Sequence, residues 1–381
     1  MDNQQAFAEE GKALVLETKV DHRVDTVSSV SEYIRLIKRK HELIDGRDEV
    51  AFYRGQIKAK FDTDDIETSN PKSSIFRNKK YRTAKGEIGK IFYEKKYYYE
   101  AITRLPSEFN GLSSVDRLVK MSHYGWPTRL LDFTTLPLVA LYYACSDAVV
   151  EQNRNIALLE RSNAIDGVVY HINQKFPTKI GGDGILSYDS DRALLLACLP
   201  RLTYREQKVV EIVAEYLLSR QLRIKGNVRT GLDIVFKDII DIALKENSKV
   251  LNKDYGDGQE EQLDFYTVSK IFSKLYSEAE RESSTFRDFN TNPEDLLNPY
   301  MILPQLNKLK TDKLAAQGLA FCMAGLRQET MTCKKIIVPV NEKPNILEEL
   351  SLLGINKVTL NNDLISHGEF VNSKVDKFLL Q

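Results

Sequence analysis

The stretch HYGWPTRLLDFT, residues 123–134, links two segments with helical patterns and fixes how the chain turns between them. The spacing of apolar residues predicts a helix over 114–125, and Gly125 is the kind of residue that ends a helix in a left-handed conformation. A proline follows two positions later, so the helix cannot continue. The sequence therefore predicts a tight corner, with His123 and Tyr124 at the end of the first helix.

The second half of this stretch, TRLLDF (128–133), has two interpretations. If it forms a helical turn, Arg129 and Asp132 are three residues apart and can pair with each other, while the apolar residues between them pack into a core. The alternative is that both charged side chains face a cleft and contact a ligand. A further helix is expected over 135–152, with a proline in its first turn, where proline is tolerated.

The rest of the chain mixes the two kinds of element without an internal repeat. Strands are predicted at 49–60, 166–173, 334–340 and 355–360. Helices are predicted at 28–44, 89–109, 345–354 and, as three amphipathic segments, between 205 and 290. Non-adjacent strands among helices indicate the α+β class. We expect a mixed sheet core flanked by helices, with a helical insert.

Composition and charge are those of an ordinary folded protein. Of 381 residues, 42% are hydrophobic, and 54 basic residues balance 54 acidic ones. A net charge of zero argues against a global attraction to nucleic acid or to anionic membranes. No apolar run is long enough to span a bilayer, and the N-terminal stretch lacks the pattern of a secretory signal. We therefore expect no membrane partner. The four cysteines lie mostly in apolar surroundings, which fits a reducing compartment, so we expect a cytoplasmic location.

The first candidate site is the end of the predicted strand at 49–60. The guanidinium of Arg54 offers a planar fork for phosphate or carboxylate, and Gly55 permits a close approach of a ligand to the backbone. Tyr53 and Gln56 flank this pair and are candidate ligand-binding residues. The competing interpretation is that Arg54 forms a structural ion pair beside a turn.

A second candidate is the interval 76–99, which interleaves aromatic and basic side chains. Such a composition binds single-stranded nucleic acid when rings stack on bases and cations contact phosphates. The competing interpretation is a helix with tyrosines on its buried face and lysines in solvent. The sequence leaves a nucleic-acid partner open here.

Standard catalytic and metal-binding motifs are missing from the sequence. There is no phosphate-binding G-x-x-x-x-G-K-[ST] loop, no G-x-G-x-x-G after a strand and no G-x-S-x-G elbow. The five histidines are scattered along the chain, so we expect no zinc site built from histidine and cysteine.

Two segments resemble the FRG-domain family. Residues 52–56, Phe-Tyr-Arg-Gly-Gln, match its aromatic-Arg-Gly signature, and residues 122–142 follow its QHYGxPTRLLDxTxxPLxALYFA pattern. Further matches are Pro71, Phe76-Arg77, Glu100 and the segment 317–321. The departures are Ser122 in place of glutamine, Lys313 in place of arginine and Asn361-Asn362 in place of a Phe-Pro pair.

The resemblance implies an organisation for the whole chain. An N-terminal arm would span 1–24, the first part of an FRG-type core 25–204, the helical insert 205–290 and a completing core segment 291–381. The family is largely uncharacterised, and its members resemble bacterial and phage-borne cytosolic proteins. A role in phage–host conflict is therefore one expectation.

Two classes of function stay open. In the first, the chain is a non-enzymatic module that binds a small-molecule nucleotide, a nucleic acid or a protein. In the second, it is similar to ADP-ribosyltransferases, which place an Arg-Gly or His-Gly at the end of their first strand to hold NAD. A hydrolase with a metal ion at Glu100 and Asp132 is the remaining alternative. Whether the chain is an enzyme at all stays open.

The candidate residues follow from these alternatives. The catalytic residues of a transferase would be Arg54, Glu100, His123 and Gln317. The ligand-binding residues would be Tyr53, Gly55, Gln56, Tyr124, Arg129 and Asp132. In either class we expect Arg54, His123 and Gln317 to converge on one pocket, although they are far apart in the sequence.

Overall fold

The computed structural model describes thirteen stretches of the chain. They are residues 24–42, 49–57, 70–77, 81–83, 86–146, 165–175, 184–248, 251, 263–303, 317–328, 331–361, 366 and 368. The expected N-terminal arm, 1–24, falls almost wholly outside them, as does Lys313. Within these stretches, every helix is too short or too polar to cross a membrane.

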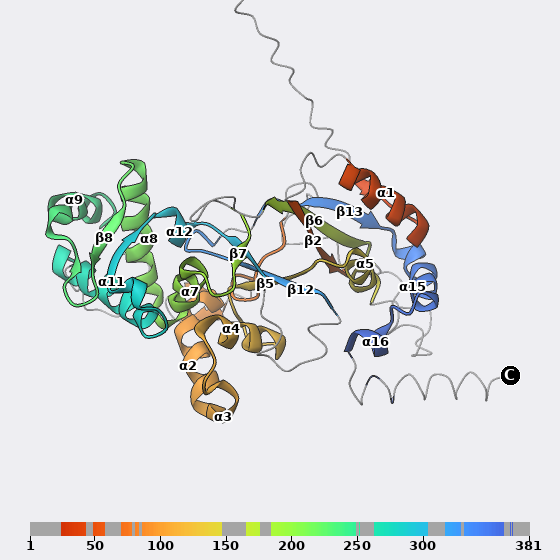
Figure 1. Cartoon of the computed structure of the whole chain (residues 1–381), viewed down its shortest axis with the longest axis horizontal. Helices are drawn as coiled ribbons and strands as arrows, with labels where there is room; N and C mark the ends of the chain where they lie inside the picture. The colour runs from red at the N-terminus through yellow and green to blue at the C-terminus, as the bar shows by residue number, and fades with distance from the viewer. Residues whose placement is uncertain are drawn as a thin grey trace, which may run out of the picture.

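The centre of the molecule is a mixed sheet of eight described strands (Figure 1). Their order is β1 (Asp25–Thr26), β13 (Lys334–Val338), β6 (Gly167–Lys175), β2 (Glu49–Gln56), β5 (Leu130–Thr134), β12 (Leu319–Met323), β11 (Tyr300–Leu303) and β7 (Leu186–Ser187). The outermost pairs, β1 with β13 and β11 with β7, are parallel, and the pairs between them are antiparallel. The late strands β12 and β13 flank the central three, so the end of the chain completes the sheet.

Twelve described helices surround this sheet, which confirms the α+β class. They are α1 (Val30–Glu42), α2 (Glu94–Arg104), α3 (Pro106–Phe109), α4 (Ser114–His123), α5 (Pro137–Cys145), α7 (Asp191–Cys198), α8 (Tyr204–Ser219), α9 (Lys237–Glu246), α11 (Phe265–Glu280), α12 (Glu294–Leu297), α15 (Lys343–Leu352) and α16 (Lys357–Asn361). Helices α8, α9 and α11 lie at one end of the long axis, and α1 and α15 at the other (Figure 1).

The predicted helical insert also contains strands. Between α8 and α9 the chain forms the hairpin β8 (Ile224–Asn227) and β9 (Gly231–Leu232), and β10 (Asp288–Thr291) pairs with β8 in antiparallel register. Gly231 has a φ of +80°, a conformation that glycine adopts without strain. The three amphipathic helices are present as predicted, and a small sheet accompanies them.

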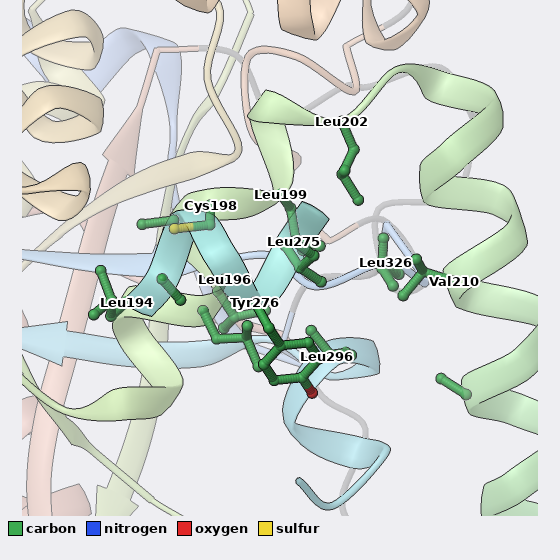
Figure 2. Packing of buried hydrophobic residues seen from close by; sticks show 14 of the residues in the cluster. Leu194, Leu196, Cys198, Leu199, Leu202, Val210, Leu275, Tyr276, Leu296 and Leu326 are labelled. Atoms are coloured by element: carbon green, nitrogen blue, oxygen red, sulfur yellow. The ribbon is translucent and has the colours of Figure 1, made fainter. Parts of the chain in front are cut away.

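The insert shares its apolar core with the central sheet. Leu130 of β5 and Met323 of β12 belong to the same buried cluster as Val210 of α8 and Leu275 of α11. Figure 2 shows leucines that follow one another along α7 and the turn after it packed beside α11 and α12. Removing this much apolar surface from water is the main force that holds such layers together. The domain boundaries at 204 and 291 stay predictions.

The opposite end of the molecule has its own apolar layer. Helices α1, α5 and α15 cover the sheet there and bury side chains against β2, β6 and β13. Helix α1 contributes Tyr33, Leu36 and Ile37, which lie on one face at helical spacing. The hydroxyl of Ser29 accepts a hydrogen bond from the backbone N–H of Glu32 at 3.2 Å, which caps the helix.

The corner after α4 folds as the sequence predicts. Helix α4 begins with a capping box, in which Ser113 and Asp116 satisfy each other's backbone N–H groups. It ends at His123, and Gly125 follows with a φ of +80°. The left-handed glycine therefore ends the helix and starts the corner.

The helical turn in 128–133, on which one of the two interpretations of this segment depended, does not form. Residues Leu130–Thr134 form strand β5, which is held between β2 and β12. In a strand, residues three apart point to opposite faces, so Arg129 and Asp132 cannot pair as expected. The short apolar run here was compatible with a strand or a helix, and the neighbouring strands decide between them.

The strand expected over 355–360 is also wrong, because this segment forms the short helix α16. Gly354 has a φ of +79°, a conformation that ends α15. The side-chain oxygen of Asn356 then accepts hydrogen bonds from the N–H groups of Val358 and Thr359 at 3.0 and 3.1 Å. This cap starts a new helix, which buries Leu360.

The four cysteines are free and buried, as their apolar surroundings predict. Burial raises the pKa of the Cys198, Cys322 and Cys333 thiols to about 12. They are therefore protonated near neutral pH and behave as small apolar side chains.

Candidate functional site

The central sheet opens between β2 and β5. These two strands pair at one position, Tyr53 opposite Thr134, while β2 pairs with β6 along its whole length. Beyond that point the carbonyl of Asp132 accepts a hydrogen bond from the Nη1 of Arg54 at 2.6 Å, in place of a backbone N–H of β2. A cavity of about 290 Å³ lies at this opening.

The cavity brings together residues that are far apart in the sequence. Arg54 comes from β2, His123 from the end of α4, and Gln317 from the turn before β12, and all three line it. The predicted convergence of these three side chains is therefore present in the structure. The other lining residues are Tyr53, Gly55, Ser122, Asp132, Phe133, Thr134, Val139, Tyr143, Leu319 and Phe321.

Arg54 has unused hydrogen-bonding capacity. Its side chain is half-buried, and its Nε is buried without a hydrogen-bond partner in the described part of the chain. Desolvation lowers the pKa of Arg54, and the negative charge of Asp132 opposes that effect. Leaving a buried donor unsatisfied costs about 1–3 kcal/mol, and more for a charged group. An anion in the cavity would balance the positive charge of this guanidinium.

Asp132 is the carboxylate of the cavity, and it is exposed although it lies on an interior strand of the sheet. The hydroxyl of Ser122 donates to its Oδ1 at 3.3 Å. Two guanidinium groups interact with it electrostatically, those of Arg54 and Arg77, and desolvation lowers the pKa of Arg77 as well. Two cations beside one carboxylate leave a net positive charge at this side of the cavity.

Gln317 is held firmly at the opposite wall. Its Nε2 donates to the carbonyl of Leu360 at 3.0 Å, and its own carbonyl accepts from the hydroxyl of Thr134 at 2.6 Å. The next residue, Gly318, has a φ of +53°. These contacts fix the loop that carries the amide before a ligand arrives, which is the kind of preorganisation that favours binding.

Two tyrosines supply aromatic surface to the cavity. The ring of Tyr53 stacks on that of His171 with centroids 5.1 Å apart, and its hydroxyl is 2.8 Å from Nε2 of His41. Burial raises the pKa of Tyr53 to about 12. The pKa of Tyr143 is also raised, by burial first and then by Tyr142 and Asp132. Both phenols are therefore neutral near pH 7.

Gly55 has a structural reason to be glycine. A Cβ at this position would lie 1.8 Å from the carbonyl oxygen of Ala140 in α5. The sequence predicted that a ligand approaches the backbone here, but the group that lies against Gly55 is helix α5. This contact presses α5 onto β2 and places Val139 and Tyr143 at the cavity wall.

Arg129 lies away from the cavity, in the core. Its side chain is 1% exposed, and its Nε and Nη2 donate to the two carboxylate oxygens of Glu94 at 3.0 and 2.6 Å. Its Nη1 donates to the carbonyl of Ala324 at 3.0 Å, and the amide of Gln207 contacts both Arg129 and Glu94. Arg129 therefore ties β5 to α2 and α8, and the structure gives it no access to a ligand in the cavity.

Three other predicted residues do not line the cavity. Tyr124 is 64% exposed and contacts the ring of His123 edge-on. The Oε1 of Gln56 is buried without a hydrogen-bond partner among the described residues. Glu100 lies on α2, where it pairs with Arg104 at 2.5 Å. Within the described stretches no three His, Cys, Asp or Glu side chains are grouped to hold a metal ion, and Glu100 does not meet Asp132.

The comparison with known families gives a match that includes most of the cavity residues. The FRG domain family model matches residues 49–153. This segment is an FRG domain. It carries β2, α4, β5 and α5, and hence every cavity wall except the one formed by Gln317, Leu319 and Phe321. No curated protein and no solved structure matched the chain.

Sequence reasoning did not assign several residues of the FRG domain to the site. Ser122 was noted as a departure from the family pattern, yet it lines the cavity and contacts Asp132. Arg77 was noted in the Phe-Arg match, and it lies within electrostatic reach of Asp132 and Arg54. Tyr143 lies one turn after Val139 in α5, and both line the cavity. Such i, i+4 spacing was the signal that could have found it.

Proposed function

We propose that the FRG-domain cavity binds a small phosphate-bearing nucleotide and that the chain acts as a nucleotide-binding module. The proposal rests on the guanidinium of Arg54, which is half-buried at the cavity wall and whose Nε has no hydrogen-bond partner among the described residues. Phosphate oxygens accept from such a fork in a bidentate manner. Arg77 adds a second cation near the same place.

The remaining walls fit the other parts of a nucleotide. Tyr143, which is half-buried, gives the cavity aromatic surface for a base, and Gln317 offers a fixed amide for a hydrogen bond. The volume, about 290 Å³, is at the lower end of the roughly 300–1,000 Å³ of small-molecule sites. A mononucleotide is therefore favoured over a ligand that must be enclosed along a greater length.

An ADP-ribosyltransferase-like enzyme that uses NAD is the second candidate. It is favoured by the placement of Arg54-Gly55 and Gln317 on one cavity. In such a reaction the bond between ribose and nicotinamide breaks, nicotinamide leaves with the bonding electrons, and an acceptor nucleophile bonds to the ribose. Asp132 and Gln317 would stabilise the cationic ribose, with His123 beside them. Glu100 lies outside the cavity, so Asp132 replaces it as the carboxylate of this scheme.

The test is a thermal-shift titration of the full chain with AMP, ATP and NAD. A ligand that binds the folded state alone stabilises it by about 2.7 kcal/mol at a hundredfold excess over Kd. We expect a concentration-dependent rise in Tm that Arg54→Ala abolishes. Arg229→Ala, which removes an exposed arginine from the β8–β9 turn, is the matched control and should keep the rise.

The outcomes separate the candidates. If no nucleotide raises Tm, or if Arg54→Ala keeps the full shift, the cavity is not a nucleotide site. Incubation with NAD, followed by detection of free nicotinamide by chromatography, then distinguishes a binding module from a transferase. Release of nicotinamide that Arg54→Ala and Asp132→Asn remove would favour the transferase, whereas binding of NAD without release favours the module.

A further inference from the structure

A second hollow lies on the surface of helix α2 and does not share a residue with the cavity. The residues that line it on α2 and on the turn before this helix are Phe92, Lys95, Lys96, Tyr99, Glu100 and Thr103, and Thr203, just before α8, closes it. We call these residues the α2 groove. It is shallower and wider than the cavity, with a volume of about 460 Å³. Helices α2 and α3 stand at the lower edge of the ribbon in Figure 1. Within the groove, the side chains of Lys96 and Tyr99 are exposed.

The groove has an excess of positive charge. Lys95 and Lys96 form no ion pair with a carboxylate in the described part of the chain, whereas Glu100 is neutralised by Arg104 at 2.5 Å. Lys274 of α11 approaches from the insert, where it contacts Glu206 at 2.6 Å. Burial lowers the pKa of Lys95, and the nearby charge of Lys274 adds to that effect. The carboxylate of Glu206, which pairs with Lys274, opposes this effect on the pKa of Lys95. The cations around the groove still outnumber the carboxylates, which favours an anionic ligand.

The groove also holds aromatic rings at the surface. Tyr99 is 42% exposed, and the buried ring of Tyr98 meets it edge-on at 5.7 Å. Phe92 stacks on Tyr204 with centroids 4.1 Å apart. Neighbouring rings fix both Phe92 and Tyr99, so little conformational freedom is lost when another flat group stacks on them. Rigid exposed rings among lysines are the typical elements of a single-strand binding surface.

We propose that the α2 groove binds single-stranded nucleic acid, with Tyr99 stacking on a base and Lys95, Lys96 and Lys274 contacting the backbone phosphates. A duplex keeps its base faces stacked inside, so its phosphates would contact the lysines but no base would stack on Tyr99. Of the interval 76–99 that the sequence singled out, the proposal therefore retains helix α2 and adds Lys274 from the insert. Tyr98, by contrast, is part of the core.

The balanced charge of the chain shapes the expected binding. With 54 basic and 54 acidic residues, the attraction is local, so a few phosphate contacts decide the affinity. Each contact to a single strand contributes about −0.7 to the slope of log K against log salt concentration. Loss of Lys95 and Lys96 should therefore flatten that slope by about 1.4.

The experiment is a fluorescence-anisotropy titration of the full chain with a labelled 12-nucleotide single strand, at several salt concentrations from 50 to 300 mM. Oligo-dT and oligo-rU are separate arms, with a DNA duplex and a polyglutamate peptide as comparisons. The variants are Lys95→Ala/Lys96→Ala, Tyr99→Ala and Tyr99→Phe. The matched control is Lys225→Ala/Lys245→Ala, which removes two exposed lysines from β8 and α9. Thermal melts confirm that each variant is folded.

The proposal predicts a specific set of results. Tyr99→Ala should weaken single-strand binding by about tenfold, while Tyr99→Phe keeps the stacking face and the affinity. The Lys95/Lys96 variant should show the flatter salt slope, and the Lys225/Lys245 control should not. Arg54→Ala should bind the oligonucleotide as tightly as the wild type, because the groove is independent of the cavity.

Other results would overturn it. Equal loss in both lysine pairs would mean diffuse attraction rather than a site, and an unaffected Tyr99→Ala would remove the stacking contact. Equal affinity for polyglutamate would make the groove an acidic-peptide surface, and a preference for duplex would make it a phosphate surface alone. No binding of either oligonucleotide at 50 mM salt would end the proposal, whatever the cavity does with nucleotides.

Discussion

Arg54 lies on β2 and Arg129 immediately precedes the neighbouring strand β5, and their guanidinium groups have opposite surroundings. Arg129 is buried, and Glu94, Gln207 and the Ala324 carbonyl surround its nitrogens. Arg54 reaches one backbone carbonyl, has a buried Nε without a partner among the described residues, and lines a cavity. The same side chain therefore completes the core in one place and leaves donors for a ligand in the other.

The role of each arginine therefore depends on the hydrogen-bond partners around its guanidinium group and not on the residue type. The partners of Arg129 lie 35 and 78 residues away in the chain, on α2 and α8. Nothing within the signature segment itself reveals them. A buried charge that is fully paired is a structural feature, whereas one that is half-satisfied at a cavity wall is a candidate binding group.

The largest effect expected from this comparison is on the stability of the Arg129→Ala variant. Removing one partner leaves the Glu94 carboxylate, 3% exposed, as an uncompensated buried charge. The free energy of unfolding should fall by about 3–5 kcal/mol, measured by urea denaturation at pH 7. A loss below about 1 kcal/mol would show that the pair is less important than its burial indicates.

A double substitution separates the unpaired charge from the lost packing. Arg129→Met with Glu94→Leu removes both charges and keeps most of the volume, so much of the stability should return. If the double variant is as unstable as Arg129→Ala alone, lost packing at β5 rather than the lone carboxylate explains the effect.

The sequence alone predicted the parts of this site that depend on local signals. Gly125 ends α4 because glycine adopts a positive φ there, and the motifs at Arg54, His123 and Gln317 marked residues that meet at one cavity. These predictions rest on backbone conformations and on motif residues, both of which can be read along the chain.

The sequence could not predict what depends on contacts between distant segments. Residues 128–133 formed a strand rather than a helical turn because β2 and β12 offered hydrogen bonds on both sides. The sequence around Arg129 does not show that its partner is Glu94 of α2, so Arg129 was included among the candidate ligand-binding residues. Gly55 was assigned to ligand access, although the group above it is the backbone of α5. In each case tertiary structure overrides the local signal.

A second buried polar side chain, His171, lies behind the cavity wall, where its ring stacks on that of Tyr53. Both of its ring nitrogens are buried and make no hydrogen bond of standard geometry among the described residues, although the side chain of Asn173 lies near enough to oppose the change in pKa. Burial, together with the charges of Lys40 and Lys334, lowers the pKa of His171 from 6.5 to about 4. The folded state thus binds fewer protons than the unfolded state between these values.

The predicted result is a loss of stability in acid. The contribution of His171 is fully present above pH 6.5 and is lost as the pH falls toward 4, by up to about 3 kcal/mol in total. Substitution of His171 by Phe keeps a ring against Tyr53 and removes this titration. Urea denaturation at intervals from pH 7 to pH 4 should show a shallower decline for His171→Phe than for the wild type. Parallel curves would mean that His171 finds a proton acceptor or solvent when it is charged.

The smallest effect is expected for the stability of Arg54→Ala, and it bears most directly on the comparison. The variant loses one hydrogen bond to the Asp132 carbonyl, which contributes about 0.5–1.5 kcal/mol. It also removes a buried donor whose unsatisfied state is destabilising. Because these terms oppose each other, the free energy of unfolding should change by less than about 1 kcal/mol in the same urea assay without ligand.

Nucleotide makes the contrast between the two arginines measurable. Adding it should stabilise the wild type and leave Arg54→Ala unchanged, since that variant lacks the cation that would donate hydrogen bonds to the phosphate. Arg129→Met with Glu94→Leu, in which the cavity is intact, should still gain stability from the nucleotide. If Arg54→Ala instead loses as much stability as Arg129→Ala, then Arg54 is a structural residue like Arg129. In that case the main reason to propose an anion in the cavity is removed.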